Sequence, residues 1–286
     1  MEETRTDRRS AQLIGLLPFA VGAAYYADVV KGLCVRWWED PNYSHGFFVP
    51  LFSLYLLWED RRAIGKCGGE GSLAGSLIIV SAAIMKMFSH MILSPYLAGI
   101  SLIVMVCGVV MCCWGWRTLG RAAVPIGFLI FMLPLPHPAY ELVSLPLQRM
   151  AAVLAAGALQ IVSIPVLREG NVIHFAGRSL EVAEACSGIR LLMGFVAMGV
   201  AVAFLSRRPA WQRATLVGST VPIAVLANAL RVTITGVLYH GVSEDLAQGF
   251  FHAFSGWLMF VAALAALAGE CRILARVFPA RLGGAR

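Results

Sequence analysis

Three side chains in the carboxyl-terminal part of the chain could together perform acyl transfer: Cys186, Arg231 and His252. A cysteine thiolate is a strong nucleophile, and a nearby imidazole can take the thiol proton and return it to a leaving amine. A guanidinium stays charged and can stabilise the oxyanion of a tetrahedral intermediate. The three residues could therefore cleave a peptide bond through a thioester, provided that the fold brings them together.

Each of these residues also has a simpler explanation when it is taken alone. Cys186 could be a small packing residue or could pair with Cys34, Arg231 could be an interfacial anchor, and His252 could be an interfacial polar residue. The seven cysteines include no C-x-x-C pair and show no metal-site spacing with histidine. We therefore expect no metal and no cofactor.

The elements that must position these side chains are membrane spans. Hydrophobic residues make up 59% of the 286 residues, charged residues make up 14%, and the mean hydropathy is +0.75. A soluble domain carries roughly 25% charged residues, so the surplus apolar surface must face lipid. The net charge of +7 is explained by basic cytoplasmic loops, and we expect no nucleic-acid partner.

Hydropathy and turn signals predict an all-α polytopic membrane protein that forms a single domain over residues 1–286. About eight transmembrane helices are expected at 12–30, 46–58, 73–93, 95–115, 122–134, 188–206, 213–239 and 252–270. These divide the chain into amino-terminal spans at 12–134, an interfacial and hairpin region at 135–187, and candidate catalytic spans at 188–275. Residues 165–187 alternate around Gly177, which predicts a small β-hairpin before the sixth span.

The distribution of basic residues predicts the orientation. If the polar-interrupted stretch 141–164 does not cross, the cytoplasmic segments hold 15 lysines and arginines and the outer segments hold six. This asymmetry places both termini in the cytoplasm and the 141–164 helix at the outer interface. Trp37, Trp38 and Tyr43 then fit an outer aromatic belt.

The three reactive residues fall at a similar depth in this arrangement. Each lies 18 to 21 residues from a cytoplasmic arginine on the same span, namely Arg207, Arg213 or Arg272. At the helical rise this distance is roughly 27–32 Å, about one hydrocarbon thickness. We therefore expect Cys186, Arg231 and His252 near the outer membrane boundary, on consecutive spans.

At these residues the chain resembles the exosortase family. The resemblance is carried by Glu184-Ala185-Cys186-Ser187-Gly188-Ile189-Arg190, by Asn228-Ala229-Leu230-Arg231-Val232, by His252-Ala253-Phe254-Ser255-Gly256-Trp257, and by Tyr43-Ser44-His45-Gly46-Phe47-Phe48-Val49-Pro50-Leu51 with the following Leu54-Tyr55-Leu56-Leu57-Trp58. It extends over roughly residues 12–275, with the motifs in the family's order.

The resemblance implies a membrane cysteine endopeptidase or transpeptidase of the bacterial inner membrane, with its site facing the periplasm. Its substrates would be exported proteins with a PEP-CTERM tail, which consists of a Pro-Glu-Pro motif, an apolar helix and a basic cluster. By similarity Cys186 is the nucleophile, His252 the acid and base, and Arg231 the stabiliser of the transition state. An amine at the cell surface, or water, would accept the acyl group.

Four further residues are candidates for binding substrate or supporting the site. Arg190 lies one turn after Cys186 and could bind an acidic group of the substrate or pair with Glu184. Asn228 lies one turn before Arg231 and could orient it or form an ordinary interhelical hydrogen bond. His45 could belong to the site or be a structural residue of the interface.

Three other classes of function compete with this interpretation. A thiol redox membrane protein would need a pair of cysteines at the outer face, where only Cys34 and Cys186 are expected. A transporter could use Lys86 and Arg231 to line a path, but it should show inverted repeats and broken helices near the midplane, which the sequence does not clearly contain. A non-catalytic scaffold for exopolysaccharide export is the third alternative. A scaffold would tolerate loss of the Cys186 thiol.

Overall fold

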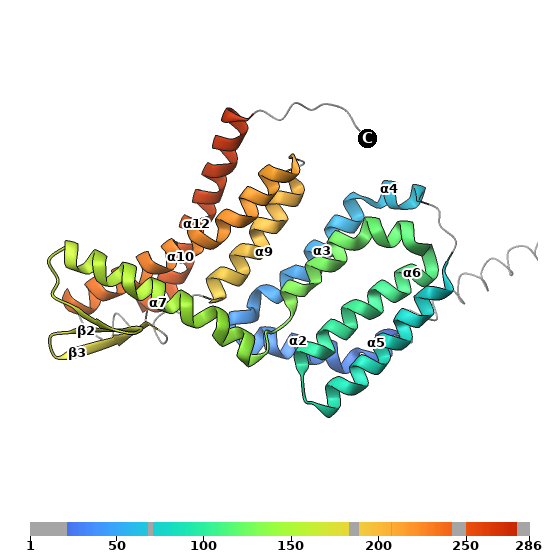
Figure 1. The fold of residues 1–286 in the computed structure, drawn as a ribbon, viewed down its shortest axis with the longest axis horizontal. Coiled ribbons are helices and arrows are strands. Elements are labelled where there is room, and N and C mark those ends of the chain that lie inside the picture. Colours follow the sequence, from blue (N-terminus) through green and yellow to red (C-terminus); the bar gives the residue numbers. More distant parts are fainter. Residues whose placement is uncertain (1–21, 68–70, 183–188, 207, 242–249, 279–286) are drawn as a thin grey trace, which may run out of the picture. The chain divides into compact units, whose positions relative to one another are not determined.

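The fold is mostly helical, with one small β-sheet (Figure 1). The computed structural model describes residues 22–67, 71–182, 189–206, 208–241 and 250–278, without the side chains of 178, 189–191, 239, 241 and 250–257. Contacts between Cα atoms group the chain into two compact units, Met1–Pro136 and His137–Arg286, which are described separately below.

The amino-terminal unit is built from helices alone in its described part. Its elements are α2 (Ala27–Glu39), the 3₁₀ helix η1 (Pro41–Phe47), α3 (Phe48–Glu59), α4 (Arg61–Lys66), α5 (Leu73–Met91), α6 (Pro95–Phe128) and the 3₁₀ helix η2 (Leu129–Met132). Helix α5 packs tightly against the first part of α6, with no room for a side chain at two glycines. A Cβ atom on Gly75 would overlap Cys112, and one on Gly108 would meet Ile79 at 2.9 Å. Small residues thus allow two spans to approach closely.

Gly115 divides α6 into two helices. Its φ of 76° and ψ of −178° lie outside the helical region, in a conformation that glycine adopts without a steric penalty. The second part packs against α3, where the Ser53 hydroxyl donates to the Pro125 carbonyl at 2.8 Å. The predicted separation into a span at 95–115 and a shorter one at 122–134 agrees with this break.

The aromatic residues of the predicted outer belt do not all face outwards. Trp38 is 83% exposed, as a belt residue should be, but Trp37 and Tyr43 are only 6% and 5% exposed. The Trp37 indole donates to the carbonyl of Met132 at 2.9 Å. The belt prediction is therefore wrong for Trp37 and Tyr43, because these side chains join α2 and η1 to the core of their own unit.

The carboxyl-terminal unit surrounds one long central helix. Its elements are α7 (His137–Ile161), β1 (Leu167–Glu169), β2 (Val172–Phe175), β3 (Arg178–Glu181), α9 (Ile189–Leu205), α10 (Ala210–Gly241) and α12 (Phe250–Val277). Helix α10 contacts α7, α9 and α12. The predicted spans beginning at 188, 213 and 252 are thus helices that begin within three residues of these positions.

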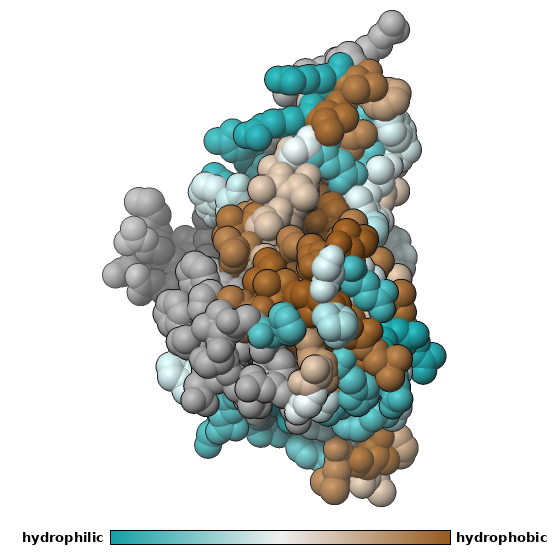
Figure 2. All heavy atoms as spheres, turned by 90° about the vertical axis from the view of Figure 1, so that its left-hand side faces the viewer, coloured by the Kyte–Doolittle hydropathy of each residue, from teal (hydrophilic) through white to brown (hydrophobic). Residues whose placement is uncertain are grey.

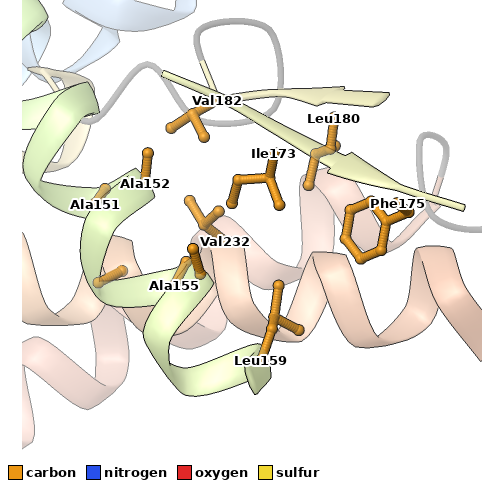
Figure 3. Packing of buried hydrophobic residues seen from close by; sticks show 11 residues of the cluster. Ala151, Ala152, Ala155, Leu159, Ile173, Phe175, Leu180, Val182 and Val232 are labelled. Atoms are coloured by element: carbon orange, nitrogen blue, oxygen red, sulfur yellow. The ribbon is translucent and has the colours of Figure 1, made fainter. Parts of the chain in front are cut away.

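The predicted hairpin is present as part of a three-stranded antiparallel sheet in the order β1-β2-β3. Gly177, with a φ of 81°, lies in the turn between β2 and β3, and Ile173 pairs with Leu180. One face of the sheet packs on α7 and α10, as Figure 3 shows. The cluster contains Ala151, Ala152, Ala155, Ala156, Leu159, Ile173, Phe175, Leu180, Val182, Ala229 and Val232.

By length and composition, five described helical segments could cross a membrane. They are Leu73–Met91, Pro95–Met132, His137–Ile161, Ala210–Leu238 and Leu258–Val277, and Leu192–Leu205 is a shorter apolar helix. Large apolar side chains such as Leu142, Leu226 and Val261 remain exposed, and Figure 2 shows hydrophobic atoms gathered across the middle of one face. The chain is a multi-pass membrane protein, while the count of eight spans, their orientation and the interfacial position of α7 remain predictions.

Candidate functional site

Arg231 is a half-buried residue on the central helix α10. It follows Ala224 and Ala227 by seven and four residues, so it lies on the same stripe of the helix. Both alanines are buried in a cluster with Leu192 of α9 and Met259 of α12. Arg231 therefore lies on the side of α10 that packs against α9 and α12, the two helices that begin nearest to Cys186 and His252.

The start of α9 lies level with Arg231. Helices α9 and α10 approach closely at Gly199, where a Cβ atom would overlap the Thr220 side chain. The two helices are antiparallel and rise equally per residue, so ten residues before Gly199 on α9 lie level with ten residues after Thr220 on α10. This count pairs Ile189 with Leu230. The backbone of Arg190 is helical at this level, and its side chain lies outside the described residues.

Cys186 and Glu184 themselves lie outside the described residues, but the chain on both sides of them is described. On the amino-terminal side, Val182 is fully buried and belongs to the same cluster as Val232, the neighbour of Arg231. Figure 3 shows these two valines together between the sheet and α10. The described residues on the two sides of Cys186 thus lie beside the same short stretch of α10: Val182 is buried with Val232, and Ile189 lies level with Leu230.

His252 lies in the first turn of α12, and its side chain is outside the described residues. The Ser219 hydroxyl donates to the Glu270 carboxylate at 2.5 Å, which aligns α10 with α12. Counting from this contact pairs Arg231 with Leu258 and leaves the His252 backbone about 9 Å further toward the amino-terminal end of α12. The sequence predicted one common depth for Arg231 and His252. The helical register instead places their backbones at two different levels.

Asn228 is the one buried side chain in the described part of the chain that leaves a polar atom without a hydrogen-bond partner. The residue is 3% exposed, and its Oδ1 atom accepts no hydrogen bond. By contrast, the buried amide of Gln148 on α7 accepts a hydrogen bond from Asn171 at 3.4 Å. An orphaned acceptor one turn from Arg231 is unfavourable for folding alone, which favours a role for Asn228 in the site.

His45 has a structural contact within the amino-terminal unit. Its Nε2 atom lies 3.1 Å from the carbonyl of Phe131, 86 residues further along the chain. Burial lowers the pKa of His45 below its ordinary value, so the ring stays neutral and Nε2–H can donate to this carbonyl. Of the two roles predicted for His45, the structural one thus has a direct observation behind it.

Gly46 and Trp37 pack beside the contact between His45 and Phe131, a role that the sequence alone did not indicate. A Cβ atom on Gly46 would overlap the Trp37 indole ring, whose N–H reaches Met132. His45 and Trp37 therefore satisfy adjacent carbonyls at the end of η2. The available signal was the Tyr43–Leu51 motif, in which a glycine follows the histidine directly.

Lys86 is a buried cation that the transporter alternative would place along a path. Its Nζ atom lies 2.7 Å from the Asp28 carboxylate, donates to the Tyr25 carbonyl, and sits 4.1 Å from the centre of the Tyr25 ring. Lys86 is thus paired within the amino-terminal unit. Elsewhere in the described residues, no three histidine, cysteine or acidic side chains are grouped so that they could hold a metal.

Comparison with known protein families gives a match over most of the chain. The family model described as transmembrane exosortase (Exosortase_EpsH) matches residues 37–269, which include all seven candidate site residues. Comparisons with curated proteins and with solved structures give no match. Because the family model matches far more than half of the chain, the chain belongs to the transmembrane exosortase family.

Proposed function

We propose that this exosortase-family protein is a membrane cysteine endopeptidase or transpeptidase. It cleaves the carboxyl-terminal sorting signals of exported proteins at the outer face of the inner membrane, through a thioester on Cys186. The substrates are proteins with a PEP-CTERM-type tail. The family in general processes sorting signals, and the specific mechanism proposed here is carried by the residues around Arg231.

The observation that supports the mechanism most directly is that the described residues on both sides of Cys186 lie close to the part of α10 that carries Arg231. Val182, four residues before Cys186, is buried with Val232. Ile189, three residues after Cys186, lies level with Leu230 by the helical register described above. Three residues can span at most about 11 Å, which supports the proposed placement of Cys186 near Arg231.

The proposed order of the groups along the membrane normal suits acyl transfer. His252 lies at the outer level and Arg231 at the inner level, with Cys186 between them. The Cys186 thiol gives its proton to His252, and the thiolate attacks the scissile carbonyl carbon. Arg231 donates hydrogen bonds to the carbonyl oxygen as it becomes negative, and His252 returns the proton to the leaving amine.

A second addition completes the reaction. Water or an amine attacks the thioester carbonyl, His252 takes the proton of this nucleophile, and the Cys186 thiolate leaves. Asn228 supports Arg231 from one turn below, and Arg190 at the start of α9 is placed to bind an acidic residue of the sorting signal. Glu184 would either neutralise Arg190 or help to orient it.

The decisive experiment is co-expression of the protein with an exported protein carrying a PEP-CTERM tail, followed by mass spectrometry of the new carboxyl terminus. Wild type should yield one defined cleavage site, and Cys186→Ala should yield none while accumulating normally in the membrane. Cys67→Ala and Cys271→Ala are matched controls, because these two half-buried cysteines lie near the predicted cytoplasmic face. Normal cleavage by Cys186→Ala would refute the cysteine mechanism.

A further inference from the structure

A cleft of about 440 Å³ lies inside the amino-terminal unit, where the turn between α5 and α6 meets α2. His90 from the last turn of α5 and Pro95 from the start of α6 line one side of it. Both helices are long and apolar enough to cross a membrane, so the turn between them lies at a membrane boundary. The cleft therefore lies at the depth of lipid headgroups, whichever face of the membrane this is.

Two opposite charges on the α2 side of the cleft do not neutralise each other. Arg36 and Glu39 both line the cleft and are exposed. They are three residues apart, so their Cβ atoms are neighbours at about 5–6 Å on the helix surface. Neither forms an ion pair with another described residue, and the Arg36 guanidinium lies 6.0 Å from the centre of the Tyr43 ring. A positive and a negative group are thus both available to one ligand.

The position of Glu39 is unfavourable for α2 itself. Glu39 is the last residue of the helix, where the main-chain carbonyls leave a partial negative charge, and Asp40 follows it as the C-cap. The Asp40 carboxylate has a structural role, because it accepts a hydrogen bond from the Asn42 N–H at 2.9 Å. The Glu39 carboxylate accepts no such bond from the residues that the structure describes. A cationic ligand would relieve the repulsion at this helix end.

The rest of the cleft adds no further charge that needs a partner. The Asp28 carboxylate lies 2.7 Å from the ammonium group of Lys86 and 3.3 Å from His90. Val35 and Leu93 also line the cleft, and both are exposed. Leu93 has a φ of 52°, a conformation that usually belongs to glycine at a helix end, so an apolar side chain is kept here in spite of backbone strain. A fitting ligand has one positive group, one negative group and an apolar body.

We propose that this cleft binds the headgroup of a zwitterionic aminophospholipid, of which phosphatidylethanolamine is the simplest. Its ammonium group donates hydrogen bonds to the Glu39 carboxylate, and its phosphate accepts them from the Arg36 guanidinium. The short ethanolamine link keeps the two groups close enough to reach both side chains. The acyl chains lie against Val35 and Leu93. This inference does not depend on the proposed function, because the cleft belongs to the amino-terminal unit alone.

Other lipids share only part of this chemistry. Phosphatidylglycerol has the phosphate for Arg36 but no cation for Glu39. Phosphatidylcholine has both charges, but its quaternary ammonium group has no N–H to donate to a carboxylate. The cleft should therefore prefer phosphatidylethanolamine to phosphatidylcholine, and phosphatidylcholine to phosphatidylglycerol.

The first test measures thermal unfolding of the full wild-type chain in detergent, with each of the three lipids added in turn and with the same acyl chains. A lipid that binds only the folded protein raises the unfolding temperature as its concentration increases. Phosphatidylethanolamine should act at about one tenth of the phosphatidylglycerol concentration. Equal shifts by these two lipids would overturn the inference. Equal shifts by soluble glycerophosphoethanolamine and by the lipid would assign the cleft to a small soluble ligand and overturn it as well.

The second test locates the binding with substitutions. Glu39→Gln and Arg36→Gln should each weaken phosphatidylethanolamine binding by about tenfold, and Glu39→Gln should remove the preference over phosphatidylglycerol. Glu59→Gln is the matched control for the acid, because Glu59 is also the last residue of a helix but does not line the cleft. Arg62→Gln on α4 is the control for the lost positive charge. A preference kept by Glu39→Gln, or an equal loss in Glu59→Gln, would contradict the proposed site.

Discussion

The two units of the chain treat their buried polar groups differently. In the amino-terminal unit, His45, Trp37, Ser53 and Lys86 all have partners within the unit. In the carboxyl-terminal unit, the described part of α10 contains the Asn228 carboxamide, which is buried with an orphaned oxygen. A satisfied polar network makes a structure rigid and specific, whereas an unsatisfied acceptor costs folding free energy.

This difference in hydrogen bonding distinguishes a structural amino-terminal unit, called the frame below, from a carboxyl-terminal unit that contains the candidate site. In hydrocarbon, unlike in water, an unpaired polar group has no solvent partner, so its cost is high and it needs a compensating role. The proposed role in the carboxyl-terminal unit is catalysis beside Arg231. Substitutions in that unit should therefore change processing more than stability, and substitutions in the amino-terminal unit should do the reverse.

Among the substitutions that compare the two units, the largest effect is expected at Arg231, where even the conservative change Arg231→Lys should be damaging. Lysine keeps the positive charge but lacks the planar fork of donors that an oxyanion needs, so processing should fall by about 10²–10³ and nearly as far as in Arg231→Ala. The measurement is processed fraction against time at matched membrane abundance. Arg213→Lys, on the predicted cytoplasmic end of the same helix, is the control. Near-normal processing by Arg231→Lys would reduce Arg231 to an interfacial anchor.

Gly46→Ala tests the frame. The added methyl group would overlap the Trp37 indole, so the ring must move and its hydrogen bond to Met132 must weaken. Overpacking of this kind typically costs about 1–3 kcal/mol of unfolding free energy. Thermal unfolding in detergent should show the loss, while activity per folded molecule stays unchanged.

Gly32→Ala is the matched control for this frame test. It lies on α2, where a Cβ atom meets nothing within 4 Å. Alanine at such a position should leave stability unchanged or raise it by about 0.5–1 kcal/mol. Equal destabilisation by both variants would show that the contact with Trp37 is not the cause.

Asn228→Leu tests the orphaned acceptor. Leucine has a similar shape and removes the unsatisfied oxygen, so the free energy of unfolding should stay constant or rise by up to about 1 kcal/mol. Processing should fall several-fold, since Arg231 loses its neighbour. Gln148→Met is the control, because that amide accepts a hydrogen bond from Asn171 and its loss should destabilise. Destabilisation by Asn228→Leu would indicate a structural hydrogen bond.

Most helix positions were predictable from the sequence because an apolar run of span length has few alternatives. The first span was placed wrongly, since α2 (Ala27–Glu39) continues past residue 30, where the span predicted at 12–30 ends. The hairpin was predictable from alternation around Gly177, but β1 was not, since Leu167–Glu169 is three exposed residues without a pattern. The burial of Trp37 was also missed. An indole near the end of a span suits both a lipid interface and a core, and only the distant partner Met132 distinguishes them.

The residue types of the candidate site and their approximate depth stay predictions, because Cys186 and the His252 side chain lie outside the described residues. Counting residues from cytoplasmic arginines assumes that every span begins at the same level. The contact of Gly199 with Thr220 replaces this assumption with a register between α9 and α10, and the hydrogen bond from Ser219 to Glu270 gives the register between α10 and α12 that separates His252 from Arg231. The structural role of His45 depends on a residue 86 positions away, which no local pattern contains.

The smallest effect is expected from titration of His45. Burial lowers its pKa in the folded protein, while the unfolded chain keeps the ordinary value of about 6.5. The unfolded state therefore binds more protons below about pH 6.5, and this contribution to stability is lost as the pH falls through the lowered pKa. Above about pH 6.5 both states carry a neutral ring, and the group causes no pH dependence.

His45→Gln isolates this contribution. Glutamine keeps a hydrogen-bond donor for the Phe131 carbonyl but does not titrate between pH 5 and 8. The unfolding temperature of wild type should fall from pH 7 to pH 5 more steeply than that of His45→Gln, with the two curves parallel above pH 7. If processing at pH 7 is lost in His45→Gln while the unfolding temperature is kept, His45 belongs to the site rather than to the frame, and the comparison between the two units fails at that residue.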